Sequence, residues 1–303
     1  MFFILKLIFI ILILISVAFV TLLERKILGY VQYRKGPEKL GLLGVLQPFS
    51  DALKLLSKMK LKLELFNKMI YFFSPIFGLM MMLIYWVLMD MFFFLGQVEL
   101  DYQFLVFLLI SSMSVYMILL SGWAANSKYS LLGAYRGVAQ VISYEVSMSF
   151  FLLVILLFSM KLSLMSLMKI QSQSFILVLG FLVVFFLWMV LILAETNRSP
   201  FDISEGESEL VSGFNVEYSG AEFAMLFLAE YGNLLFMSSL SAKMFLFFNM
   251  KMFFIEMMIL LMLFLLVRGT LVRYRYDILM NMAWKEILIF SLFYLMIIFL
   301  MNF

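Results

Sequence analysis

Eight apolar stretches of about 20 residues divide this 303-residue chain, and they constrain its fold more than any other feature. An α-helix of that length crosses the hydrocarbon core of a bilayer, whereas a non-helical segment would leave backbone polar groups without partners there. Strands of a membrane barrel would alternate polar and apolar residues, which the stretch 177–193 does not do. The sequence therefore predicts an all-α membrane protein, one domain over 1–303, with transmembrane helices at 2–23, 70–94, 103–125, 138–160, 174–194, 219–242, 249–267 and 284–302.

The composition narrows the chemistry that this chain can perform. It is 65% hydrophobic and 14% charged, and it contains neither Cys nor His. It therefore lacks the usual ligands of iron–sulfur clusters, haem and zinc, and it has no glycine-rich nucleotide motif. Any electron-carrying cofactor is expected in partner chains.

The distribution of positive charge predicts the orientation. Of the 22 Lys and Arg residues, 17 lie in the segments that follow the first, third, fifth and seventh apolar stretches. Loops rich in Lys and Arg stay on the cytoplasmic or matrix side of a membrane. We therefore expect these four segments on that side and both termini on the other.

Two features follow the first apolar stretch. The charged triplet Glu24–Lys26 is expected to end the first helix, with its charges at the lipid headgroups. The segment 47–58 begins with Pro48 in a helix-start position and places Leu53 and Leu56 one turn apart. It predicts an amphipathic helix at the membrane interface, which serves either as an anchor or as a lid over a lateral opening.

The segment 194–218, called the acidic loop below, has one positive charge, Arg198, among six carboxylates. Carboxylates next to lipid need water, a proton or a partner, so we expect this loop to fold and to pack partly against something other than lipid. Ser204 and Glu207 have the spacing of a capping box, which predicts a short helix starting at Ser204. The six carboxylates are Glu195, Asp202, Glu205, Glu207, Glu209 and Glu217.

Two further apolar stretches carry acidic residues. Glu145 lies well inside the fourth stretch, where it is either a neutral acid bonded to a neighbouring helix or part of a proton relay. Phe223, Phe227 and Glu230 are spaced to share one face of the sixth helix. That aromatic face either packs against a neighbouring helix or forms the wall of a ligand site.

The segment 267–277 places Arg268, Arg273 and Arg275 close to two tyrosines. Because a guanidinium group pairs well with carboxylates, we expect these arginines to pair with the acids of the acidic loop, which is predicted on the same side. Binding of lipid phosphate is the alternative.

Six motifs together carry a family resemblance: ERKILGYVQYRKGP, LQPFSDALKL, SGWAANSKYSLLGAYRGVAQVISYEVS, LAETNRSPFDISEGESELVSGFNVEYS, FLAEY and RYRYDILMNMAWK. In this order they resemble subunit 1 of mitochondrial NADH:ubiquinone oxidoreductase, respiratory complex I. The resemblance implies an eight-helix subunit of the mitochondrial inner membrane that forms most of the ubiquinone tunnel. It implies partners in the membrane arm and in the quinone module of the peripheral arm, contacts with phospholipids, and NADH, FMN and iron–sulfur clusters in partner subunits only.

The resemblance also assigns roles to individual residues. The quinone-binding residues would be Arg25 and Arg268 at the tunnel entrance, Phe223 and Phe227 on its wall, and Arg198 and Asp202 along it. A chain of carboxylates would lead protons from the quinone site toward the membrane arm. Its members would be Glu145, Glu195, Glu205, Glu207, Glu217 and Glu230, with Arg136, Arg273 and Arg275 in support.

The chain departs from the family pattern at Met59, where a Glu is usual, and at Val272, where a Pro is usual. Glu222 has no family counterpart and is left out of the expected site. The rival class is a proton- or ion-coupled secondary transporter, which often uses broken helices at the membrane midplane. Only Pro75 of the four prolines lies within an apolar stretch, near its end, which disfavours the transporter.

Overall fold

The computed structural model describes residues 2–59, 66–90, 102–159, 161–173, 182–204, 206, 210–247, 249 and 251–302. Over these residues the chain is helical and contains no strand. The helices are α1 (Phe2–Val31), α2 (Gln47–Ser57), α3 (Lys68–Asp90), α4 (Gln103–Ala125), α5 (Lys128–Ser159), α6 (Leu164–Gln173), α8 (Leu182–Glu195), α10 (Gly220–Ser241), α11 (Phe253–Thr270), α12 (Tyr276–Asn281) and α13 (Leu288–Asn302).

Within that described part of the chain, seven helical segments are long and apolar enough to cross a membrane. They are α1, α3, α4, α5, α10 with the turn that follows it, α11, and α12 continued into α13. The predicted helix at 174–194 is described only from Leu182, where it forms the shorter apolar helix α8. The prediction of an all-α membrane protein is confirmed, and the eighth crossing stays a prediction.

Some helix ends differ from those expected. The first helix does not end at Glu24–Lys26 but continues to Val31, because Glu24 is buried and finds partners inside the protein. The fourth crossing begins at Lys128 rather than at 138. The last crossing begins at Tyr276, because a π-helical turn at Met282–Ile287 joins α12 to α13.

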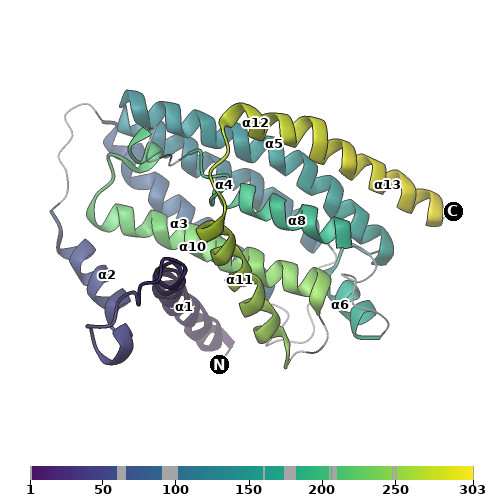
Figure 1. The fold of residues 1–303 in the computed structure, drawn as a ribbon, viewed down its shortest axis with the longest axis horizontal. Helices are drawn as coiled ribbons and strands as arrows, with labels where there is room; N and C mark the ends of the chain where they lie inside the picture. The colour runs from purple at the N-terminus through teal and green to yellow at the C-terminus, as the bar shows by residue number, and fades with distance from the viewer. Residues whose placement is uncertain are drawn as a thin grey trace.

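Most of the other helices pack against one of two central helices, α5 and α10. Figure 1 shows α13 lying along the length of α5, while α4 and α8 pack against α5 as well. The helix α10 packs against α3, α1 and α11. Gly78 and Gly232 permit close packing, because a Cβ atom at either position would overlap a methionine side chain of a neighbouring helix. The largest fully buried side chains of the α5 core include Trp188, Tyr144 and Phe151.

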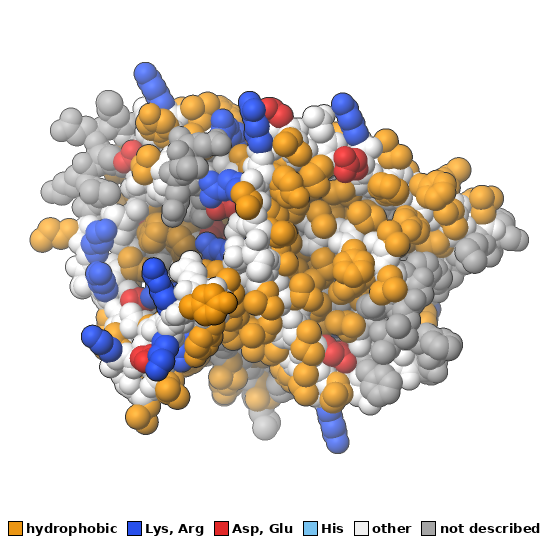
Figure 2. All heavy atoms as spheres, in the orientation of Figure 1, with side chains coloured by type: hydrophobic (Ala, Val, Ile, Leu, Met, Phe, Trp, Pro, Cys, Tyr) orange, Lys and Arg blue, Asp and Glu red, His pale blue; other side chains and the backbone are white. Residues whose placement is uncertain are grey.

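The predicted helix at 47–58 is present as α2, with Pro48 in its first turn. It contacts α1 and α10, and its Leu53 and Leu56 side chains are exposed to the surroundings. Figure 2 shows basic side chains at the end of the molecule where α2 lies and along the edge formed by α5 and α12, and apolar side chains over much of the rest of this face.

Candidate functional site

A buried ionic cluster joins α1, the acidic loop and the end of α11. Glu24 on α1 is only 4% exposed, and one of its carboxylate oxygens accepts a hydrogen bond from Arg268 in the last turn of α11. The guanidinium of Arg198 lies 3.9 Å from the other oxygen of Glu24. It also lies 4.1 Å from the centre of the Tyr231 ring on α10, a cation–π contact. The cluster therefore contains Arg198 and Arg268, which the sequence analysis assigned to the site. They surround Glu24, which the sequence analysis did not assign to it.

The expected pairing of three arginines with the acidic loop is correct for one of them. Arg273 pairs with Asp202 of the acidic loop at 3.2 Å. Arg268 pairs with Glu24 instead, because the end of α11 packs against α1. Arg275 pairs at 3.2 Å with Asp277, and both of these side chains are exposed.

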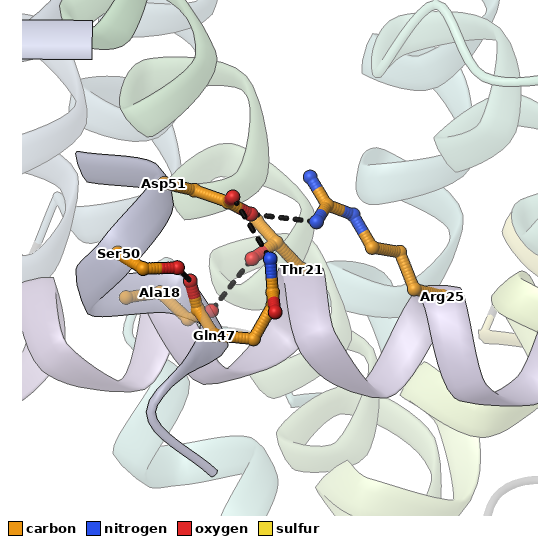
Figure 3. Close-up of polar contacts among 6 residues, drawn as sticks. All are labelled: Ala18, Thr21, Arg25, Gln47, Ser50 and Asp51. Atoms are coloured by element: carbon orange, nitrogen blue, oxygen red, sulfur yellow. Dashed lines mark hydrogen bonds and ion pairs between the residues drawn. The ribbon is translucent and has the colours of Figure 1, made fainter. Parts of the chain in front are cut away.

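A second ion pair ties α2 to α1. Arg25 donates to Asp51 at 2.6 Å, and Gln47 donates to the other oxygen of Asp51 at 3.0 Å (Figure 3). The side chain of Arg25 is 53% exposed, so this pair contributes little to stability, on the order of 1 kcal/mol or less. Its structural effect is to orient the start of α2 against α1.

A small polar cavity lies between α3, α4, α5, α10 and the start of the acidic loop. Its volume is about 50 Å³, and Glu195 and Glu230 both line it. A water molecule needs about 10–15 Å³ by this measure, so the cavity has room for about three. Four lining oxygens are buried and have no hydrogen-bond partner among the described residues: Glu195 Oε2, Asn197 Oδ1, Ser204 Oγ and Asn233 Oδ1. Such oxygens cost free energy unless water satisfies them, so the cavity is suited to hold water.

The other members of the expected carboxylate chain either do not line this cavity or lie outside the described residues. Glu145 on α5 is half-buried and accepts a hydrogen bond from Ser111 on α4 at 3.2 Å, but it does not line the cavity. Glu217 is half-buried, and its backbone carbonyl accepts the hydroxyl of Tyr71. Glu205, Glu207 and Glu209 lie outside the described residues, and with them the helix expected from Ser204.

The predicted aromatic face is formed. The rings of Phe223 and Phe227 are 4.4 Å apart on α10, and Tyr231 continues the row at 6.3 Å from Phe227. Phe223 and Phe227 are partly buried against the core that joins α1, α3 and α10. They do not line the polar cavity, which lies beside Glu230. The structure therefore separates the aromatic face from the carboxylate cavity, with Tyr231 and Arg198 next to both.

Two contacts hold the ends of the acidic loop. Gln140 on α5 is fully buried and donates to the carbonyls of Ala194 (2.9 Å) and Phe201 (2.7 Å). At the other end, Tyr218 stacks on Tyr71 with ring centres 4.3 Å apart and shares a 2.9 Å hydrogen bond with Ser74. Burial raises the pKa of the Tyr218 hydroxyl above its ordinary value, and the hydrogen bond with Ser74 partly opposes that shift. The prediction that this loop folds and packs against protein holds for its described residues.

Sequence reasoning missed several buried polar residues. Glu24 was treated as a surface charge, although its position next to Arg25 in a motif of the resemblance marked it for attention. Glu222 was left out, yet it is 3% exposed in the first turn of α10. Lys243, which the sequence did not single out, is 1% exposed in a π-helical turn, with its ammonium 5.3 Å from the Phe253 ring. Arg136, expected in a supporting role, is half-buried on α5.

The fold and this site define a multi-span α-helical membrane protein that keeps ionisable side chains in its interior. In the described part of the chain, no group of three or more His, Cys, Asp or Glu residues is arranged to hold a metal ion. The family model described as NADH dehydrogenase matches residues 4–299, and the chain belongs to this family.

Individual relatives are similar over nearly their whole length. NADH-ubiquinone oxidoreductase chain 1 of Rhipicephalus sanguineus is 47% identical over 289 residues, which cover 95% of this chain and 91% of the relative. The protein of the same name from Aedes aegypti is 47% identical over 292 residues, covering 96% and 92%. That of Branchiostoma lanceolatum is 47% identical over 290 residues, covering 94% and 91%.

Proposed function

We propose that this chain is a core membrane subunit of a proton-translocating NADH:ubiquinone oxidoreductase of the mitochondrial inner membrane. The observation that carries this proposal is the family match over residues 4–299, together with 47% identity over 289 and 292 residues to two relatives named NADH-ubiquinone oxidoreductase chain 1. Electrons come from NADH through FMN and iron–sulfur clusters in partner subunits, and the substrate met by this chain is ubiquinone. A secondary transporter is the weaker candidate, because the relatives carry the name of an oxidoreductase chain.

In this proposal the quinone passes along α10. Arg25 and Arg268 flank the entrance, and Phe223 and Phe227 form the wall that contacts the apolar tail. The adjacent rings of those phenylalanines, next to α1, support this assignment. Arg198 and Asp202 lie further along the path. Arg198 and Arg268 share the single carboxylate of Glu24, which leaves one positive charge held in this region and suits a headgroup that gains negative charge on reduction.

The carboxylates form the second part of the proposal. Reduction of the quinone headgroup takes up two protons, and Glu145, Glu195 and Glu230 respond by changing their protonation. The shared cavity of Glu195 and Glu230, with room for water between them, supports this role. Charges inside a protein interact more strongly than charges in bulk water, so we expect these acids to titrate as a coupled set. Glu205, Glu207 and Glu217 extend the set toward the quinone, and Arg136, Arg273 and Arg275 balance its charge.

The same proposal fixes the orientation and the partners. The segments after the first, third, fifth and seventh crossings face the matrix, and both termini face the intermembrane space. The excess of Lys and Arg in those segments supports this arrangement. Peripheral-arm subunits of the quinone module then dock on the end of the molecule that carries α2 and the acidic loop, while membrane-arm subunits and phospholipids cover the apolar sides.

A photoreactive ubiquinone analogue tests the quinone path. Irradiation of the assembled enzyme should label peptides that contain Arg25, Phe223 or Arg268, and excess ubiquinone should suppress the labelling. Labelling confined to other segments would reject the path.

The substitution Glu145→Gln tests the relay. It should slow quinone reduction and the proton transfer coupled to it, because a glutamine cannot release a proton, while the amount of assembled enzyme stays the same. Glu286→Gln, at an exposed position outside the proposed site, is the matched control and should change neither activity. Unaltered turnover and proton transfer in Glu145→Gln would remove this residue from the relay.

A further inference from the structure

An apolar groove runs between α5 and α13, remote from the candidate site. Its volume is about 350 Å³, and its walls include Leu153 and Leu156 of α5 and Leu295 and Phe299 of α13. The two helices run in the same direction and end at the same end of the bundle (Figure 1). Lys161, which follows α5, closes the groove at that end. The groove is therefore hydrocarbon along its length and cationic at its mouth.

The charge at the mouth has no acidic partner among the described residues. Lys161 is exposed, and it forms no ion pair with any carboxylate of the described residues. It lies just beyond the end of a membrane-crossing helix, the depth at which lipid headgroups begin. A lysine in that position raises the affinity of the site for an anionic headgroup about fivefold.

The length of the groove indicates what fills it. From Leu153 to Ser159, the end of α5, the helix advances about 9 Å at 1.5 Å per residue, and Lys161 follows. The hydrocarbon core of a bilayer is about 30 Å thick, so the groove is no deeper than one leaflet. A membrane-crossing helix of a partner subunit would need a groove of twice that length. An acyl chain with its phosphate at the mouth fits both the depth and the position of the charge.

We infer that the α5–α13 groove binds a phospholipid with an anionic headgroup, whose phosphate pairs with Lys161 and whose acyl chain lies between Leu153, Leu156, Leu295 and Phe299. The bound lipid fills the groove between α13 and α5, and α5 is the helix that carries Glu145. The inference does not depend on the proposed quinone path, because the groove and the aromatic face of α10 share no residue.

The assembled enzyme tests this inference in phosphatidylcholine vesicles that contain a small fraction of phosphatidylglycerol with a diazirine on its acyl chain. Irradiation and peptide mass spectrometry should locate the label on residues 153–162 and 295–299. The substitution Lys161→Gln should lower that labelling about fivefold. Lys251→Gln is the matched control: Lys251 is also exposed, follows α10 and does not line the groove, so its loss should leave the labelling unchanged.

Two results would overturn the inference. Equal labelling by a phosphatidylcholine probe with the same diazirine, unaffected by Lys161→Gln, would show bulk lipid without a headgroup preference. No label on either segment, together with cross-links from Leu153 or Phe299 to another subunit, would show that a protein covers the groove.

Discussion

The buried carboxylate of Glu24 offers the sharpest test of the ionic cluster. The substitution Glu24→Gln keeps the shape of the side chain and removes its charge. The side chains of Glu24 and Arg198 are 6% and 9% exposed, whereas that of Arg268 is 30% exposed. Removing one partner of a buried ion pair costs about 3–5 kcal/mol, because the remaining charge is left without compensation. Arg268 can turn toward water, and Arg198 keeps its cation–π contact with the Tyr231 ring. We therefore expect a loss of stability at the lower end of that range, about 3 kcal/mol.

The neighbouring ion pair supplies a matched control. Asp51→Asn also removes one carboxylate, but the Arg25 and Asp51 side chains are 53% and 34% exposed, so the expected cost is at most about 1 kcal/mol. The measurements are the amount of assembled enzyme on native gels and the midpoint of its thermal inactivation. Glu24→Gln should reduce the assembled enzyme several-fold and lower the midpoint by several degrees, while Asp51→Asn should change both only slightly.

A double variant checks the physical reason. In Glu24→Gln combined with Arg198→Gln, the buried guanidinium that caused the penalty is gone, so part of the lost assembly should return. Equal effects of Glu24→Gln and Asp51→Asn would refute the argument from burial. A double variant that is worse than both single variants would show that the cluster is not held by charge compensation.

Two further substitutions probe the ends of the acidic loop. Gln140→Leu removes two hydrogen bonds to loop carbonyls, and each carbonyl keeps one backbone donor, so the expected cost is about 2 kcal/mol. Limited proteolysis should then cut the loop faster than in the wild type, and an unchanged rate would contradict the role of Gln140 as an anchor. Tyr218→Phe keeps the stack on Tyr71 and loses the bond with Ser74, at about 1 kcal/mol. Tyr218→Leu, which also loses the stack, should lower the thermal inactivation midpoint further; equal shifts would assign no stability to the stacked rings.

The sequence was sufficient for the architecture because lipid leaves the backbone few options. Apolar stretches of spanning length must form helices, and the described parts of all eight do so. The helix ends were harder to predict. The charges at Glu24–Lys26 were expected to stop α1, which would hold for a helix facing lipid on all sides. In the protein, α11 and the acidic loop cover that side of α1 and supply arginines, so the helix continues.

The candidate site was predictable where one segment carries the whole signal. The acid inside an apolar stretch, Glu145, and the aromatic spacing of Phe223 and Phe227 are properties of single helices. The cavity was not predictable, since its polar atoms come from the end of α8, the acidic loop and α10. Residue types alone do not reveal which of those atoms meet.

The sequence by itself determined that the chain crosses a membrane as helices. It also determined which connecting segments are rich in Lys and Arg, and which apolar stretches contain acidic residues. Only the tertiary structure decided which charges neutralise one another, as for Glu24 and Arg268, which lie 244 residues apart. The reason is that hydropathy acts on each segment separately, whereas compensation of a buried charge depends on which helices pack together.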